Sequence, residues 1–208
     1  MPDSKEIFHR LGQMHPEAKA ELNYSSPYEL LIATVLSAQC TDIRVNLVTD
    51  VLFQQVKTPQ DMLEISRDDL EDMIRTCGMY KQKARSLHEA ARDLVDKFDS
   101  QVPSNRSQLE SLRGVGRKTA SVVLSNAFDI PAIAVDTHVG RVSRRLGLTQ
   151  QTDPDKIAKE LEGQFPKHNW TQLHHRLIFH GRYICKARKP ECDKCLLDDI
   201  CPKIGVNR

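Results

Sequence analysis

The sequence lacks any apolar run long enough to cross a membrane. Its longest apolar stretch lies around Leu30–Leu36, where Thr34 interrupts it, and is far shorter than the roughly 20 residues that a bilayer requires. The first six residues, MPDSKE, also lack the apolar core of a secretion signal. We therefore expect a protein without membrane attachment that stays in a reducing compartment, the bacterial cytoplasm.

Strand patterns, internal repeats and long linkers are equally scarce. Only Ala132–Val135 has the pattern of a short extended piece, and no second segment is an evident partner for it. Apolar residues recur instead at helical spacing, as in Leu87, Ala91 and Leu94. A chain of 208 residues can bury a substantial core as one domain or two small ones. The sequence predicts an all-α protein.

Several polar residues stand where helices should begin. Ser26-Pro27-Tyr28-Glu29 offers an N-cap, a proline at the first helical position and a capping-box glutamate. The helix that follows is apolar nearly all round, so we expect it to be buried centrally. Further helix starts are predicted at three places: Ser66-x-x-Asp69, Ser107-x-x-Glu110 and Asp153-Pro154.

The formal net charge of +2 conceals a difference between the two halves of the chain. Residues 1–100 carry 12 basic and 17 acidic side chains, whereas residues 101–208 carry 18 and 11. Such a split predicts a surface that attracts phosphate, unless it reflects only unevenly charged helix faces in solvent.

Two glycines, Gly114 and Gly116, flank Val115 between two helical patterns. We expect them to let the chain turn tightly with positive φ and to let the backbone approach another molecule closely. The residues around them do not satisfy the P-loop pattern, and no strand precedes them as a dinucleotide-binding fold requires. The segment therefore favours a helix–hairpin–helix that grips a DNA backbone over an ordinary glycine-rich connection.

Basic residues surround this hairpin. Arg113, Arg117 and Lys118 lie beside the start of the second helix, whose free N–H groups and positive dipole end favour an anion such as phosphate. Lys118 fits two roles, a solvated phosphate contact or a nucleophile that forms a Schiff base. The second role needs a neutral amine, which we expect burial, Arg117 and the helix N-terminus to favour.

Asp136 ends an apolar run and precedes another helical pattern. It is a good N-cap, and a capped carboxylate is held still and ionised, so capping is compatible with catalysis. Arg141, Arg144 and Arg145 follow, and their spacing does not distinguish phosphate ligands from a solvated face.

Four of the six cysteines crowd into the last 24 residues: Cys185, Cys192, Cys195 and Cys201. This crowding predicts a metal site. Zinc sites usually have two closely spaced cysteine pairs, and only one is present here, so the spacing favours a [4Fe–4S] cluster, with zinc as the alternative and disulfides as a remote one. Lys186, Arg188 and Lys189 give the loop between the first two cysteines a basic tip.

The segments LRGVGRKTA (112–120) and AVDTHVGRV (134–142), with the C-x6-C-x2-C-x5-C tail, resemble the endonuclease III family of helix–hairpin–helix DNA glycosylases. The resemblance extends from Leu30 to Cys201. It implies two helical lobes with DNA bound in the cleft between them. Residues 21–132 would form a six-helix lobe with the hairpin, and residues 1–20 and 133–208 the lobe that holds the iron–sulfur cluster.

The resemblance also implies roles for single residues. Lys118 and Asp136 would be catalytic and face each other across the cleft. Gln39 matches a residue that fills the space left in the duplex. Met79 stands where the family commonly has a leucine wedge, and methionine is also apolar.

The family activity implied is removal of oxidised or ring-saturated pyrimidines from double-stranded DNA, followed by strand cleavage through β-elimination, by a monomer. Related adenine glycosylases typically lack a lysine at the position of Lys118 and carry a further domain after the cluster, so we disfavour that alternative. A non-catalytic DNA-binding module with zinc would explain the hairpin and the charge split, but would leave the coincidence of Lys118 and Asp136 unexplained.

Overall fold

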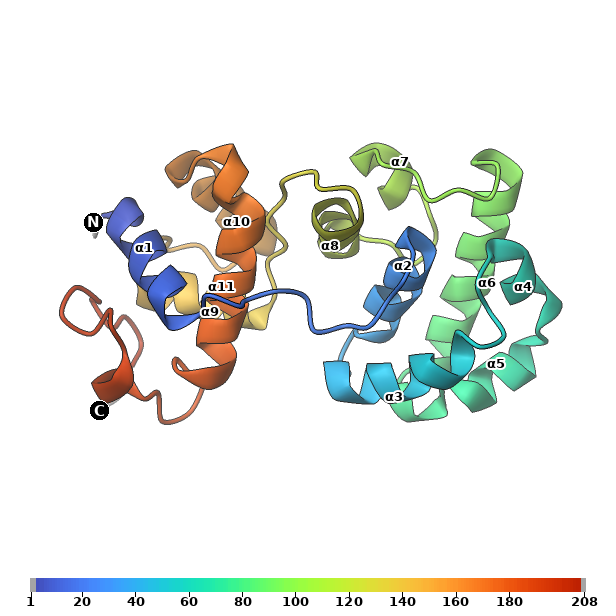
Figure 1. Cartoon of the computed structure of the whole chain (residues 1–208), viewed down its shortest axis with the longest axis horizontal. Helices are drawn as coiled ribbons and strands as arrows, with labels where there is room; N and C mark the ends of the chain where they lie inside the picture. The colour runs from blue at the N-terminus through green and yellow to red at the C-terminus, as the bar shows by residue number, and fades with distance from the viewer. Residues whose placement is uncertain (1–2, 207–208) are drawn as a thin grey trace. The chain divides into compact units, whose positions relative to one another are not determined.

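The computed structural model describes residues 3–206, and within that range every regular element is a helix (Figure 1). This confirms the all-α prediction. Ala132–Val135, the one segment with the pattern of an extended piece, is buried but forms no strand in the described part of the chain. No helix there is long and apolar enough to span a membrane.

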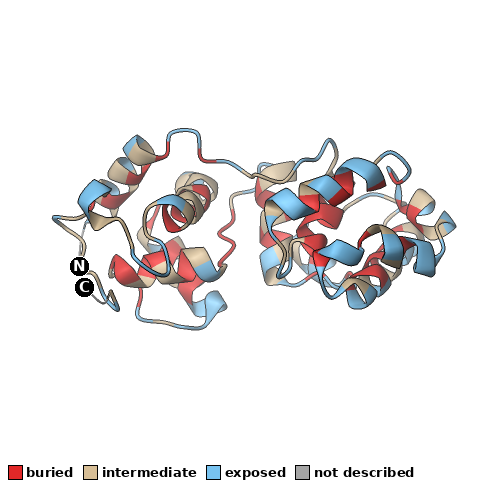
Figure 2. Cartoon of the chain, turned by 90° about the horizontal axis from the view of Figure 1, so that it is seen from below, coloured by how far each residue is buried: buried red, intermediate tan, exposed pale blue. Residues whose placement is uncertain are grey.

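The chain divides into two compact units. One comprises Glu21–Ile130, and the other combines the chain up to Ala20 with the segment from Pro131 onward. The sequence predicted that the first of these units ends at residue 132, two residues after the observed end at Ile130. In both units the buried residues occupy the inner helix faces (Figure 2).

The unit Glu21–Ile130, where we expect a six-helix lobe, contains seven α-helices and one 3-10 turn, and the count includes the short helices α4 and α7. Its elements are α2 (Pro27–Leu36), α3 (Asp42–Leu52), α4 (Pro59–Glu64), α5 (Arg67–Met73), η1 (Arg75–Cys77), α6 (Tyr80–Lys97), α7 (Arg106–Glu110) and α8 (Arg117–Ala127).

Helix α2 lies at the centre of this unit, as its all-round apolar pattern predicts. Every residue from Tyr28 to Leu36 is buried, and the helix packs against α3, α6 and α8. Ser26 caps it by accepting a hydrogen bond from the Glu29 amide at 3.1 Å. The Glu29 carboxylate accepts from the amide of Ser25, one residue earlier than a capping box requires.

The other predicted helix starts are confirmed in two of three cases. Ser66 caps α5 and Asp153 caps α10 through their side-chain oxygens. The prediction at Ser107 is wrong: Asn105 caps α7 by accepting from the amides of Ser107 and Gln108. Asparagine caps as well as serine does and stands two residues earlier, so the helix begins there.

The second unit joins the N-terminal helix to the C-terminal half of the chain. Its helix α11 packs against α1, α9 and η2 over a core that includes Ile7, Leu11, Leu173 and Leu177. Its elements are α1 (Ser4–Met14), α9 (Thr137–Arg145), α10 (Pro154–Gln164), η2 (Lys167–Asn169), α11 (Trp170–Tyr183) and η3 (Cys192–Lys194).

Candidate functional site

Helices α7 and α8 and the hairpin between them form the predicted helix–hairpin–helix. Gly114 has φ +77°, and a Cβ atom there would lie 2.6 Å from the Cβ of Ser86 on α6. Only glycine fits this position. Gly116 does not need positive φ, contrary to expectation: its φ is −95°, and nothing lies within 4 Å of where its Cβ would stand. It is exposed at the start of α8, where it leaves the backbone open to a close approach.

The N-terminus of α8 carries no side-chain cap. Its first N–H groups have no partner within the helix, and they coincide with the positive end of the helix dipole. The helix is anchored behind this end by Ala120, Val123 and Leu124, all buried. A rigid, anion-attracting backbone edge therefore follows the hairpin.

Lys118 is the second residue of α8, and its side chain is exposed. The expectation that burial desolvates its amine is wrong, because the apolar face of α8 begins two residues later. Arg113, on the hairpin, pairs with Glu89 of α6 at 3.0 Å. Lys118 thus projects from a fixed helix end into solvent, where a phosphate or a sugar can reach it.

Gln39 and Met79 lie in two other loops of the same unit. Each is exposed and has positive φ, 54° for Gln39 and 47° for Met79. Few residues other than glycine adopt this conformation, so the surrounding structure must hold both loops. Gly78, before Met79, also has positive φ, 65°.

Asp136 belongs to the other unit and caps α9, as its position predicted. One carboxylate oxygen accepts a hydrogen bond from the Val139 amide at 2.8 Å. The buried segment Ala132–Val135 fixes the chain just before it. The carboxylate, half-buried at a helix N-terminus, is held in place there.

The four C-terminal cysteines line one cavity together with His180 and Arg145. All four are free thiols. Burial raises the pKa of Cys195 to about 11 and also raises that of Cys201, with the neighbouring thiols adding to both effects. A positive centre is therefore needed to hold these sulfurs as thiolates.

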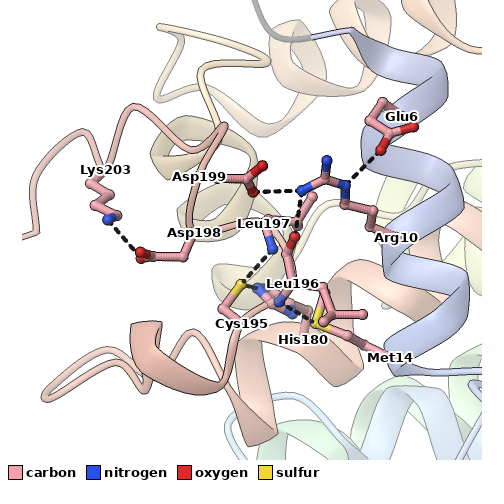
Figure 3. A network of polar contacts seen from close by, with 10 residues as sticks. All are labelled: Glu6, Arg10, Met14, His180, Cys195, Leu196, Leu197, Asp198, Asp199 and Lys203. Atoms are coloured by element: carbon pink, nitrogen blue, oxygen red, sulfur yellow. Dashed lines mark hydrogen bonds and ion pairs between the residues drawn. The ribbon is translucent and has the colours of Figure 1, made fainter.

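Several N–H groups point at the sulfurs of this cavity. The amide of Leu197 donates to the Cys195 sulfur at 3.4 Å, and Nε2 of His180 lies 3.7 Å from the same sulfur (Figure 3). The amide of Lys203 donates to the Cys201 sulfur, also at 3.4 Å. Within residues 3–206, no three His, Cys, Asp or Glu side chains converge as ligands of a single metal ion. Four sulfurs spread around one cavity fit a group larger than one ion, so this donor set suits an iron–sulfur cluster.

The sequence alone did not reveal what Arg141 and Arg145 do. Arg145 is buried and donates to the carbonyls of Lys186 and Ala187 and to the sulfur of Cys185. Arg141 donates to the carbonyl of Cys185. Both therefore hold the cysteine loop. The spacing of the arginines placed them on one helix face. It could not show that this face binds the cysteine loop, because that loop lies some forty residues further along the chain.

The basic tip of this loop is exposed, as its composition suggested: Lys186, Arg188 and Lys189 all face solvent. Lys186 also forms an ion pair with Glu191. Lys189 has positive φ, 52°, which marks a tight turn at the tip.

Comparisons with known proteins agree with these features. A family model, the HhH-GPD superfamily base excision DNA repair protein, matches residues 32–167. Endonuclease III of Bacillus subtilis is 47% identical over 193 residues, which cover 92% of this chain and 88% of the relative. Endonuclease III of Haemophilus influenzae is 46% identical over 196 residues, which cover 94% and 93%. A solved structure of a trapped covalent intermediate between endonuclease III and DNA matches with a TM-score of 0.93 and 47% identity, covering 96% of this chain and 94% of that one.

Proposed function

Because the chain belongs to the endonuclease III family of HhH-GPD base excision DNA repair proteins, we propose that it excises oxidised or ring-saturated pyrimidines from double-stranded DNA by attack of Lys118. It is a bifunctional DNA glycosylase and AP lyase. The observation that carries the role of Lys118 is its place: an exposed amine at the uncapped end of α8, directly after the glycine hairpin.

The hairpin supplies the grip on DNA. The backbone at Gly114 and Gly116 and the side chain of Arg117 contact phosphates at the N-terminus of α8, where the free N–H groups favour an anion. The exposed Lys186, Arg188 and Lys189 provide a second basic contact from the other unit. Gln39 and Met79 enter the duplex where the damaged base leaves its stack.

Chemistry at the extruded nucleotide then proceeds in two stages. The neutral amine of Lys118 attacks C1′ of the sugar, and the bond between C1′ and the base breaks, the base leaving with the electron pair and taking up a proton. The carboxylate of Asp136 assists the amine and stabilises the positive charge that develops on the sugar. The nitrogen of the adduct then loses a proton, and the C1′–O4′ bond breaks, so that the sugar ring opens and an imine forms between Lys118 and C1′. The imine acidifies a 2′ proton, whose removal expels the 3′ phosphate by β-elimination.

We propose that Cys185, Cys192, Cys195 and Cys201 hold a [4Fe–4S] cluster. When bound, the cluster ties the C-terminal loop into one structure and takes no part in breaking the glycosidic bond. Arg145 and the N–H groups around the sulfurs orient the ligands, and the loop presents its basic tip to DNA. We also propose that the protein acts as a monomer and that it works in the bacterial cytoplasm; the two endonuclease III relatives described above are from bacteria.

Borohydride trapping tests the role of Lys118. The wild-type protein and Lys118→Gln are each incubated with a duplex that contains one thymine glycol, and the imine is reduced in place. A covalent protein–DNA band with the wild type alone supports the proposal. An equally strong band with Lys118→Gln would show that another amine forms the imine.

A further inference from the structure

Lys83 is a buried cation in the unit that carries the hairpin. It is the fourth residue of α6, and only 4% of it is exposed. Its ammonium donates to the carbonyl of Leu36 at 2.9 Å and to that of Cys77 at 2.6 Å. Among the described residues no carboxylate pairs with it. Burial lowers the pKa of Lys83, so the fold holds this charge at a cost in free energy and without an ion pair to offset it.

The two carbonyls belong to the two loops that carry Gln39 and Met79. Leu36 is the last residue of α2, and Gln39 follows three residues later. Cys77 ends η1, and Met79 follows two residues later. The backbone amide of Lys83 also donates to the carbonyl of Met79 at 3.0 Å. Lys83 therefore contacts the residue at which the Gln39 loop begins, the residue at which the Met79 loop begins, and Met79 itself.

Both tips need such support because both have positive φ without being glycine. Such a conformation costs free energy and persists only where the surrounding structure over-determines it. Burial raises the pKa of the Cys77 thiol, and the neighbouring Cys40 thiol, in the first loop, adds to this effect. The two loops are therefore joined by the hydrogen bonds of the Lys83 ammonium.

We propose that Lys83 is a positioning residue that holds the Gln39 and Met79 loops in register, so that both side chains enter the DNA duplex together when the damaged base leaves. The inference rests on the proposed function, because it assigns both side chains to the duplex. Lys83 itself touches neither the sugar nor the base. Its loss uncouples the two loops and impairs extrusion of the base, while the amine of Lys118 stays in place.

The test compares two reactions of the same protein. One is excision of thymine glycol from a duplex, which needs both loops; the other is strand cleavage at an abasic site in single-stranded DNA, which has no partner strand to wedge apart. For Lys83→Met we expect the single-turnover rate of the first to fall about tenfold or more and that of the second by less than about threefold. A fluorescent 2-aminopurine opposite the lesion should report correspondingly slower opening.

Lys81→Met is the matched control, because Lys81 is exposed on the same helix and its loss removes the same charge from the surface. It should leave the ratio of the two rates unchanged, and Lys83→Arg, which keeps a donor for the carbonyls, should restore part of it. If Lys83→Met does not fold, Lys83→Gln is subjected to the same comparison. Equal loss of both rates, or no change in their ratio for a folded Lys83 variant, would overturn the proposal.

Failure of the proposed function gives a different pattern. If wild type forms no imine with either substrate, the glycosylase and lyase chemistry assigned to Lys118 is wrong. If Gln39→Ala and Met79→Ala leave duplex excision intact, the wedging roles are wrong although the lyase remains. If those two variants impair duplex excision while Lys83→Met does not, only the role of Lys83 falls.

Discussion

At the scale of the single residue, the side chain of Lys118 is exposed to solvent, while its backbone is held in the first turn of α8. We expect Lys118→Gln to lower strand cleavage at an abasic site by about a thousandfold or more, because the variant removes the amine that the first turn of α8 presents. Binding of lesion duplex should weaken by no more than about threefold, since one charge among many is lost. Quenched-flow cleavage and fluorescence anisotropy measure the two effects.

Arg113→Gln is the matched control for that variant. It removes one positive charge from the hairpin beside α8, and Arg113 is already paired with Glu89. Its cleavage rate should stay within about threefold of wild type. A loss of binding in Lys118→Gln as large as its loss of cleavage would instead make Lys118 a phosphate contact.

The two hairpin glycines should respond differently to alanine. Gly114→Ala places a Cβ against Ser86 in a left-handed conformation, so we expect about 1–3 kcal/mol of lost stability. Gly116→Ala has open space and an ordinary φ, so stability should change by less than about 0.5 kcal/mol while DNA binding weakens. Thermal unfolding and salt-matched binding separate the two. Equal destabilisation by both substitutions would contradict this assignment.

The sequence predicted that the hairpin glycines and Lys118 belong to the site, but it did not predict their backbone conformation or their exposure. The hairpin was evident from Gly114 and Gly116, yet only the backbone shows that just one of them needs positive φ. Lys118 was evident as a candidate nucleophile, but its exposure depends on where the apolar face of α8 begins. The role of Lys83 could not be predicted from the sequence. A lysine within a helical pattern is usually exposed, and the pattern does not show that its ammonium binds two carbonyls from other segments.

At the scale of the element, α6 supports three segments of the candidate site from one side. Met79 directly precedes its first residue, Lys83 donates to the carbonyls of Leu36 and Cys77, and Ser86 and Glu89 meet the hairpin at Gly114 and Arg113. These positions recur every three to four residues and so lie on one helix face. Helix starts such as Ser66 and Asp153 could be predicted because caps are local. The contacts made by this face join distant parts of the chain and could not.

Helix α9 supports the cysteine loop in a comparable way through Arg145. We expect Arg145→Gln to weaken retention of the proposed cluster by about tenfold or more, because the carbonyls of Lys186 and Ala187 lose a buried donor. Iron content per chain and visible absorbance after a chelator challenge measure this. Arg144→Gln, the half-buried neighbour, should retain iron as wild type does. If the two variants lose iron at the same rate, Arg145 does not hold the loop.

At the scale of the whole molecule, the unit containing the cysteines is assembled from both ends of the chain. Arg10 of α1 donates to the carbonyl of Leu196 and pairs with Asp199 at 2.5 Å, which fixes the N-terminal helix against the loop after Cys195 (Figure 3). Only the family resemblance indicated that this segment joins the C-terminal half.

This unit also buries four imidazoles, His15, His174, His175 and His180, and burial lowers the pKa of three of them, which makes its stability depend on pH. Burial lowers the pKa of His175 to about 4 and that of His180 to about 3, and it also lowers that of His15. The unfolded chain takes up protons at these positions below its ordinary pKa of about 6.5, while the folded unit does not. Stability is therefore fully present above about pH 6.5 and is lost as the pH falls toward the folded values.

We expect His175 alone to account for about 2 kcal/mol of the stability lost between pH 7.5 and pH 5. His175→Leu fills the same buried site without a titrating group, so the unfolding midpoint of this unit should vary less with pH in the variant than in the wild type. Trp170, the single tryptophan, lies in this unit and reports its unfolding in guanidinium by fluorescence.

His168→Leu, outside the core on η2, is the control and should leave the wild-type pH dependence unchanged. An unaltered pH dependence in His175→Leu would mean that His175 binds protons equally in the folded and unfolded states, and the acid sensitivity would then rest on the other buried histidines.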